Sequence, residues 1–364
     1  MPDNAGPLSG LKVIEFSGIG PGPHVAMLLA DLGAEVVKIE RPGSAVTNPV
    51  VERARHRVAV DLKSEEGKAF CRDAASKADV LIEGFRPGVM ERLGLGPDEL
   101  LAANEGLVYA RMTGWGQDGP LANAAGHDIN YIALTGALSA VGKAGEPPVP
   151  PQNLVGDFGG GSMYCAFGIM AALYERERSG KGQVVDAAIV DGATSLMSFF
   201  FGVRGRPFIT TERGKGMLGG AAHFYRCFTC ADGKEISLGS IEPQFYAEML
   251  AKAGAPAELA EGQMDVSKWD ENAEKLAALF KTKTRDEWRE ILEGTDACFA
   301  PVLDIDEARE HPHMKARDTF VEHEGEWHTA PAPRFSRTPG AVRSSAEDGA
   351  DVVARWSAPG PDGA

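Results

Sequence analysis

Short apolar runs alternate with amphipathic segments through the first half of the chain. Four of the runs are rich in β-branched residues, which is typical of buried parallel strands. They lie at residues 11–17, 35–40, 78–85 and 107–115. The segments between them at 23–33 and 64–77 have the apolar spacing of helices. Strands that alternate with helices predict an α/β fold, with a Rossmann-like domain built around a parallel sheet.

The second half of the chain has a different pattern. A long helix is expected at 160–177 and a strand at 184–192. Residues 195–222 then show little periodicity in their hydrophobic positions. Residues 224–240 predict a β-hairpin with ADGK at its turn, and charged helices are expected within 242–293. We therefore expect a linker after the large domain, followed by a smaller α+β domain.

Charge and composition narrow the possible functions. The 364-residue chain has a net charge of −15, which argues against a nucleic-acid partner because phosphate backbones require a basic face. An acidic chain that binds an anionic ligand must gather its arginines locally. The first ten residues lack the pattern of a secretory signal, and no apolar run approaches the roughly 20 residues of a membrane span. We expect a cytoplasmic protein without a membrane partner.

The five cysteines are scattered, which is not the pattern of a disulfide framework. Cys227 and Cys230 form a lone CxxC motif, and no second pair of ligands stands at the spacing of a zinc site. The HPH sequence at 311–313 is best explained as a solvated loop. We therefore expect metal-free chemistry.

The turn after the first expected strand is rich in glycine. Its sequence is GIGPGP at 18–23, and it departs from the G-x-G-x-x-G turn of dinucleotide-binding folds because position 23 is proline. Its two prolines also remove N–H donors that a pyrophosphate would need. At the end of the next strand, Glu40 would suit the 2′-hydroxyl of NAD, whereas Arg41 would suit a phosphate on an adenosine ribose. Arg41 is equally explained as a surface residue at a strand end.

Two residues have features of acid–base chemistry. His127 precedes a helical apolar pattern, so we expect it at a helix N-terminus, where the dipole lowers the pKa of the imidazole and favours a neutral base. Asp157 precedes three glycines and a long helix. We expect it to be an N-cap beside free N–H groups that could stabilise an oxyanion, with glycines that let a substrate approach. Each residue could also be a plain helix cap, but together they suit proton transfer next to a carbonyl.

Long motifs around these two residues resemble a known family. GHDINY at 126–131 and LVGDFGGGSM at 154–163 are the central matches. With EGFRPGVMERLGLG at 83–96, ARMTGWGQDGP at 110–120 and APRFSRTPG at 332–340, they resemble α-methylacyl-CoA racemases of the family III CoA-transferase superfamily. The matches occur in the family's order and cover nearly the whole chain.

The resemblance implies inversion of the α-carbon of 2-methylacyl-CoA thioesters through an enolate and without a separate cofactor. His127 and Asp157 would act as base and acid on opposite faces of that carbon, and Glu242 would orient the histidine. Asn153 and Tyr225 match positions near the aspartate. The backbone at Asp157 would hold the thioester oxygen.

The resemblance also implies a set of positions that bind CoA, whose ribose phosphate would give Arg41 a function. These positions are Arg41, Ala59, Val60, Asp61, Leu62, Lys63, Glu83, Gly84, Arg86, Arg92, Gly126, Asp128, Ile129, Asn130 and Tyr131.

The architecture implied by the resemblance is an interlocked homodimer. Residues 1–194 would form the large CoA-binding domain, which 331–364 would complete. Residues 195–223 would be a linker, 224–310 the small domain and 311–330 a returning linker. Each active site would lie between the large domain of one subunit and the small domain of the other.

Three other functions compete with a racemase. A CoA-transferase on the same fold would use Asp157 as a nucleophile that forms an acyl anhydride, but it would not need a base at His127. An NAD-dependent dehydrogenase is disfavoured by Pro23. An acyl-CoA-binding protein without turnover would leave the acid–base pair without a function.

Overall fold

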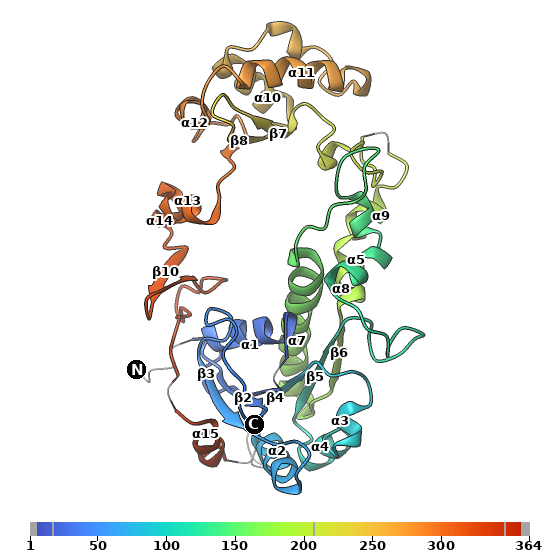
Figure 1. Ribbon diagram of the computed structural model, residues 1–364, viewed down its shortest axis with the longest axis vertical. Coiled ribbons are helices and arrows are strands. Elements are labelled where there is room, and N and C mark those ends of the chain that lie inside the picture. The colour runs from blue at the N-terminus through green and yellow to red at the C-terminus, as the bar shows by residue number, and fades with distance from the viewer. Residues whose placement is uncertain (1–5, 17, 207, 346, 358–364) are drawn as a thin grey trace. The chain divides into compact units, whose positions relative to one another are not determined.

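The computed structural model describes residues 6–16, 18–206, 208–345 and 347–357, which form two compact units. The large unit comprises the described residues of Met1–Thr135, Gln152–Leu196 and Pro312–Ala364. The small unit comprises those of Gly136–Pro151 and Met197–His311 (Figure 1). The domain boundaries expected from the sequence stay predictions.

The large unit is built on a six-stranded parallel sheet in the order β3-β2-β1-β4-β5-β6. The strands are β1 (Lys12–Phe16), β2 (Glu35–Glu40), β3 (Arg55–Ala59), β4 (Val80–Glu83), β5 (Val108–Thr113) and β6 (Val184–Ala188). The predicted α/β fold with a parallel sheet is therefore confirmed.

Helices cover both faces of this sheet, as a parallel sheet requires. The helices of the large unit are α1 (Pro21–Asp31), α2 (Glu65–Lys77), α3 (Val89–Arg92), α4 (Pro97–Ala103), α5 (Asp128–Leu134), α7 (Met163–Ser179), α8 (Ile189–Leu196), α14 (Pro312–Ala316) and α15 (Gly349–Arg355). Alternate strand residues point to opposite cores. Val13 and Val80 lie in a core with residues of α1 and α7, and Ile14 and Leu81 lie in a core with residues of α2 and α15.

The sequence pattern does not predict β3, because its residues RHRVA are mostly polar. The charges are instead paired inside the fold. The Arg55 guanidinium donates through Nε to Glu15 Oε2 of β1 at 2.8 Å, and both side chains are almost fully buried. Arg53, just before β3, forms a similar pair with Asp31 and donates to the carbonyl of Thr329. That carbonyl belongs to the hairpin of β10 (Phe320–His323) and β11 (Glu326–Thr329), so Arg53 also ties the late segment to the sheet.

One predicted strand is wrong in its second half. The expected strand at 184–192 ends at Ala188, and α8 begins at Ile189. The cause is tertiary packing, since Gly192 lies so close to the preceding helical segment that an added Cβ would stand 1.8 Å from the carbonyl oxygen of Gly160.

The small unit contains an antiparallel sheet in the order β7-β8-β9. The predicted hairpin is confirmed as β7 (Tyr225–Thr229) and β8 (Glu235–Gly239), whereas β9 (Phe299–Pro301) was not expected. The helices are α6 (Ala137–Ala140), α9 (Ser198–Gly202), α10 (Pro243–Ala253), α11 (Trp269–Phe280), α12 (Arg285–Leu292) and α13 (Ile305–Glu310). Large aromatic side chains, including Phe224, Tyr246 and Trp288, form its core.

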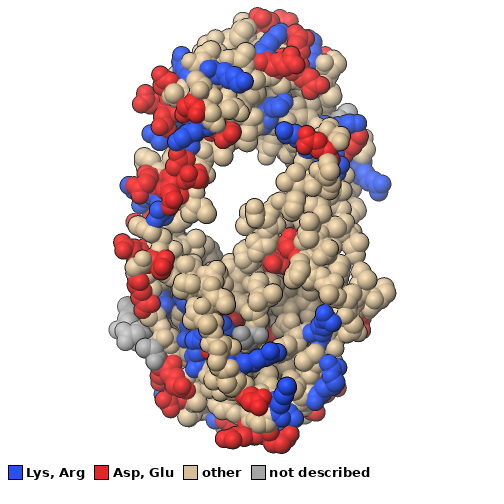
Figure 2. Space-filling model, in the orientation of Figure 1, with Lys and Arg blue, Asp and Glu red and all other residues tan. Residues whose placement is uncertain are grey.

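Acidic and basic side chains are intermixed over the visible face of each unit (Figure 2). Among the described helices, none is long and apolar enough to cross a membrane.

His223 is buried in the aromatic core of the small unit. Its ring centroid lies 5.1 Å from that of Phe224 and 5.4 Å from that of Tyr246, and neither ring nitrogen has a hydrogen-bond partner among the described residues. Burial and the nearby Arg226 guanidinium lower the pKa of the imidazole to about 4. The folded state therefore keeps His223 neutral.

We predict that His223 makes the small unit sensitive to acid. The unfolded imidazole, with a pKa near 6.5, binds a proton before the folded one does. Stability is therefore lost as the pH falls from about 6.5 to 4, by up to roughly 3 kcal/mol. His223→Phe should remove this dependence.

Hydrogen–deuterium exchange at pH 7 and pH 5 checks the prediction, with each variant compared at the same pH. Peptides from β7 and α10 should lose protection at pH 5 in the wild type and keep it in His223→Phe. Peptides from β1 and β2 in the large unit are the internal control. Equal loss of protection in the two proteins would contradict the prediction.

Candidate active site

A cavity of about 820 Å³ opens at the carboxyl ends of β1, β4 and β5 in the large unit. Its walls are the glycine turn after β1, the segment Gly84–Pro87 after β4, the end of β5 and the segment leading into α5. This is where ligands bind in parallel α/β sheets. The cavity receives His127 and Asp157, so the structure brings the predicted acid–base pair together.

Asp157 is not an N-cap, and that prediction is wrong. It lies inside a π-helical segment, Leu154–Ser162, that runs directly into α7. Segments of π-helix are rare in proteins, but those that occur often lie at functional sites. The wider turn changes the direction in which a side chain points. The carboxyl group of Asp157 thereby lines the cavity while the segment remains packed in the protein.

The surroundings of Asp157 favour its protonated form. Burial raises the pKa of its carboxyl group, and the nearby carboxylate of Asp128 raises it further, against the opposing effects of an Asn153 hydrogen bond and the charge of His127. Asp128 Oδ1 also accepts the backbone N–H of Asp157 at 2.7 Å. This hydrogen bond occupies the N–H that we expected to hold a thioester oxygen, and that role of the Asp157 backbone stays a prediction.

The glycines after Asp157 serve packing rather than substrate access. Gly160 and Gly161 are buried, and a Cβ added at Gly160 would stand 2.6 Å from the backbone nitrogen of Ala193 in α8. The glycine that does approach the carboxylate is Gly20, in the turn after β1. It has φ +70°, and an added Cβ would stand 3.1 Å from Asp157 Oδ2. The glycine spacing of this turn suggests only a dinucleotide site, and the contact with Asp157 is not visible in the sequence because the two segments are far apart along the chain.

His127 is the N-cap of α5, as the sequence predicts. Its backbone N–H donates to the side-chain oxygen of Asn130 at 3.0 Å, which fixes the start of the helix. The imidazole is exposed in the cavity that Asp157 also lines. One carboxyl group and one imidazole therefore face a common space.

Tyr131 holds the segment that precedes His127. Its hydroxyl donates a short hydrogen bond to the carbonyl of Gly126, and its ring packs edge-on against Trp115 at 4.8 Å between centroids. Gly114 leaves room for this ring, since an added Cβ would stand 2.1 Å from it. Tyr131 thus supports the wall that carries the imidazole.

A second cavity of about 1060 Å³ adjoins the first, and both are lined by Ile19, Phe85 and Arg86. Three cationic side chains, Arg41, Lys63 and Arg86, stand on the walls of the second cavity. Glu40 and Asp61 line the same cavity, so these three cations are the groups on its walls that can attract an anion.

The structure distributes the predicted CoA positions over the two cavities. The first is lined by Gly84, Arg86, Gly126, Asp128, Asn130, Tyr131 and Asn153. The second is lined by Arg41, Val60, Asp61, Leu62 and Lys63, together with Arg86.

Four predicted CoA positions lie outside these walls. Ala59 is at the exposed end of β3, and Ile129 and Arg92 are exposed on α5 and α3. Glu83 is fully buried, where its carboxylate accepts the N–H of Phe85 at 2.7 Å and Nε of Arg111 at 2.9 Å. Glu83 therefore supports the segment shared by the two cavities, and a direct contact of these four residues with CoA stays a prediction.

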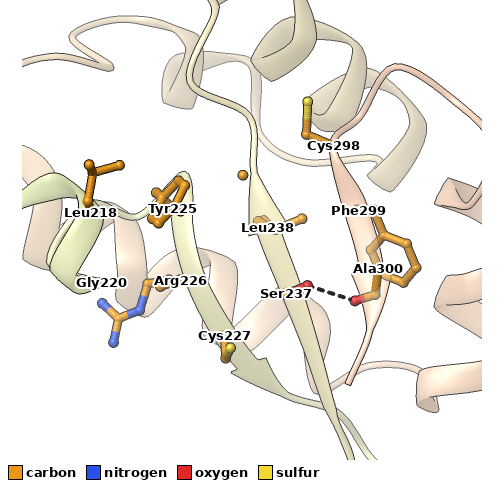
Figure 3. Close-up of a pocket in the computed structure, with 11 residues that line it drawn as sticks. Leu218, Gly220, Tyr225, Arg226, Cys227, Ser237, Leu238, Cys298, Phe299 and Ala300 are labelled. Carbon is orange, nitrogen blue, oxygen red and sulfur yellow. Dashed lines mark hydrogen bonds between the residues drawn. The ribbon is translucent and has the colours of Figure 1, made fainter. Parts of the chain in front are cut away.

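Tyr225 and Glu242 belong to the small unit. Tyr225 lines a cavity of about 670 Å³ on the face of the β7-β8-β9 sheet, beside Leu218 and Cys298 (Figure 3). Glu242 is the N-cap of α10. Their predicted roles beside His127 and Asp157 stay predictions.

The comparisons with known proteins agree with the motifs. A family model described as CoA-transferase family III matches residues 8–351. The chain belongs to this family. Proteins similar to this chain include α-methylacyl-CoA racemases and, at 31% identity over 344 residues, an acetyl-CoA:oxalate CoA-transferase from Acetobacter aceti.

An α-methylacyl-CoA racemase from Mus musculus is 46% identical over 343 residues, which cover 94% of this chain and 89% of that protein. The α-methylacyl-CoA racemase of Homo sapiens is 44% identical over 333 residues, covering 91% and 87%. The crystal structure of a CaiB/BaiF family protein from Brucella suis matches with a TM-score of 0.84 at 25% identity, covering 97% of this chain and 100% of that one. The chain is therefore a family III CoA enzyme of the racemase-like type.

No group of three or more His, Cys, Asp or Glu side chains within the described ranges could hold a metal ion.

We predict that the charge of Asp128 keeps the Asp157 pKa high. Asp128→Asn removes the negative charge but retains an oxygen that can accept the Asp157 N–H, so the Asp157 pKa should fall. Titration of ¹³C-carboxyl signals, with Asp157 assigned through Asp157→Asn, checks this. Asp186→Asn, which alters an exposed carboxylate that accepts the backbone N–H of Gln117 outside the cavity, is the control. An unchanged Asp157 titration in Asp128→Asn would contradict the prediction.

Proposed function

We propose that the protein is a racemase that inverts the α-carbon of 2-methylacyl-CoA thioesters by proton transfer through an enolate. The observation that carries the proposal is the single cavity lined by both His127 and Asp157. The identity to two α-methylacyl-CoA racemases supports the substrate class.

The reaction needs one group that removes a proton and another that returns one. The His127 imidazole takes the α-proton, and the electron pair left on carbon moves into the thioester carbonyl to form an enolate. A protonated Asp157 then gives its proton to the opposite face of the carbon, and the two residues exchange roles in the reverse direction. The raised pKa of Asp157 supports this cycle, because a catalytic acid works best when its pKa is near the working pH.

The second cavity suits the nucleotide end of CoA. CoA carries a phosphate on its adenosine ribose, and Arg41 can bind a phosphate with two parallel hydrogen bonds. Lys63 and Arg86 add positive charge along the cavity walls. In this arrangement the pantetheine arm passes Phe85 and Arg86, which both cavities share, and the thioester reaches His127.

The alternative is a CoA-transferase in which the Asp157 carboxylate attacks the thioester to form an acyl anhydride. The structure leaves that carboxylate accessible from the cavity. His127 distinguishes the two functions, because the nucleophilic route has no need for an imidazole base.

We predict that His127→Asn lowers racemisation by a factor of about 10² to 10⁴, the usual contribution of a general base. Proton NMR of each single-configuration 2-methylacyl-CoA in deuterated water measures the loss of the α-proton. His323→Asn, on β10 outside the cavity, is the matched control. Two results together would favour the transferase: the wild type does not exchange the α-proton, and the His127→Asn variant still transfers CoA to an added carboxylate.

We further propose that two copies of the chain form the working enzyme, with Tyr225 and Glu242 of one subunit completing the site of the other. An exposed apolar row on α7 supports this proposal. Its members are Met163, Phe167, Met170 and Tyr174, whose spacing of three and four residues puts them on one helix face, with 52%, 72%, 40% and 69% of each residue exposed. Contiguous exposed apolar patches mark protein–protein contacts.

We predict that the wild type has twice the mass of one chain in solution. Phe167→Glu should raise the dissociation constant of the dimer at least about tenfold, because it puts a charge into a buried apolar contact. Sedimentation equilibrium measures this. Ile305→Glu alters another exposed apolar residue, on α13 outside the row, and is the control. A monomeric wild type would contradict the proposal.

A further inference from the structure

The chain between β2 and β3 forms part of the wall of the second cavity. Arg41, Pro42 and Ser44 line the cavity from this segment, which has no regular helix or strand. Such a segment lacks the regular backbone hydrogen bonds of a helix or strand, so other contacts must fix the position of Arg41. We define residues 41–52 as the β2–β3 segment.

Glu52 gathers those contacts at the end of the β2–β3 segment. Its side chain is only 6% exposed. Its Oε2 accepts Nζ of Lys38 at 2.5 Å and Nη1 of Arg57 at 2.8 Å, and its Oε1 accepts the backbone N–H and the hydroxyl of Thr47 at 3.1 and 2.9 Å. One carboxylate therefore joins two strands to the middle of the segment.

Burial and hydrogen bonding act in opposite directions on the Glu52 carboxyl group, and their balance favours its charged form. Burial acts to raise the pKa of its carboxyl group, but hydrogen bonds from Lys38 and Thr47 outweigh burial and lower that pKa to about 2. Glu52 is therefore ionised at neutral pH, and its hydrogen bonds are charge-assisted.

The same cluster fixes the beginning of the β2–β3 segment. Arg57 donates to both carboxylate oxygens of Glu40, at 3.0 and 2.5 Å, and Glu40 directly precedes Arg41. Lys38, Arg57, Glu40 and Glu52 thus form a network of two cations and two anions. Because it holds both ends of the segment, it fixes the backbone from which the Arg41 side chain extends at the cavity wall.

We propose that Glu52 is a positioning residue for recognition of the ribose phosphate of CoA, acting through the β2–β3 segment that carries Arg41. This inference rests on the proposed binding of CoA in the second cavity. A segment that is ordered before the ligand arrives, such as the β2–β3 segment, loses less conformational freedom on binding. The Glu52 contacts should therefore affect the phosphate contact and not the rest of the ligand.

The test is calorimetric titration of the full chain with CoA and with 3′-dephospho-CoA, which needs no turnover. The wild type should prefer CoA. Glu52→Gln leaves two cations facing one anion and should weaken CoA binding about tenfold, the size of one lost charged hydrogen bond, while changing 3′-dephospho-CoA binding little. Glu35→Gln is the matched control, because Glu35 lies on β2, the strand that carries Lys38, and pairs with Arg355 outside the cavity walls.

A double-mutant cycle with Arg41→Ala tests the route of the effect. If Glu52 acts through Arg41, Glu52→Gln should change CoA affinity little once Arg41 is absent, so the two effects should not add. Additive effects, or equal weakening of both ligands by Glu52→Gln, would overturn the inference. Thr47→Val, which removes one hydroxyl hydrogen bond from an exposed position, should give a smaller loss of CoA preference if Glu52→Gln does not fold.

The two proposals fail in different ways. A wild type that binds CoA and 3′-dephospho-CoA equally would overturn the phosphate contact of the proposed function and the Glu52 inference with it. A wild type that prefers CoA, with a preference unchanged in Glu52→Gln, would overturn only the role of Glu52.

Discussion

The close packing of the π-helical segment Leu154–Ser162 against α8 and the glycine turn is the constraint on which the site depends. Gly160 and Gly192 allow the two helical segments to meet backbone to backbone, where one added Cβ would stand 1.8 Å from a carbonyl oxygen. The turn after β1 is held there too, since Ser162 Oγ donates to the carbonyl of Pro21 at 2.9 Å. Gly20 then lies beside the Asp157 carboxylate. The glycines thus bring an acid to the carboxyl edge of the sheet.

The glycine turn also explains why a Rossmann-like sheet need not bind a dinucleotide. In this chain the turn starts α1 with two prolines, which have no N–H to donate to a pyrophosphate, and its Gly20 lies against the side chain of Asp157. The basic side chains instead stand on the second cavity, beyond the ends of β2 and β4. The same sheet edge therefore carries Asp157 on one cavity and Arg41 on the other.

The sequence predicts the fold well where burial alone decides the structure. The four β-branched runs give β1, β2, β4 and β5 of the sheet, and the position of His127 before α5 follows from the apolar period. It fails where contacts between distant segments decide. The polar strand β3 is stable because Arg55 finds Glu15 in the core, and Asp157 lies within a π-helix because glycines fit against α8. Neither Glu15, the partner of Arg55, nor α8, the partner of the glycines, can be inferred from the local sequence pattern. The support of Arg41 by Glu52 also depends on strand register, which pairs Lys38 with Arg57.

The central claim is that His127 and Asp157 serve opposite faces of one carbon. The most direct measurement is the early reaction of a single-configuration 2-methylacyl-CoA with the wild-type enzyme in deuterated water. The account predicts that the inverted product carries deuterium at the α-carbon, while the unreacted starting epimer still carries its proton. Equal early deuterium in both epimers would show that one group serves both faces, and an absence of exchange with CoA transfer to a carboxylate would contradict the racemase itself.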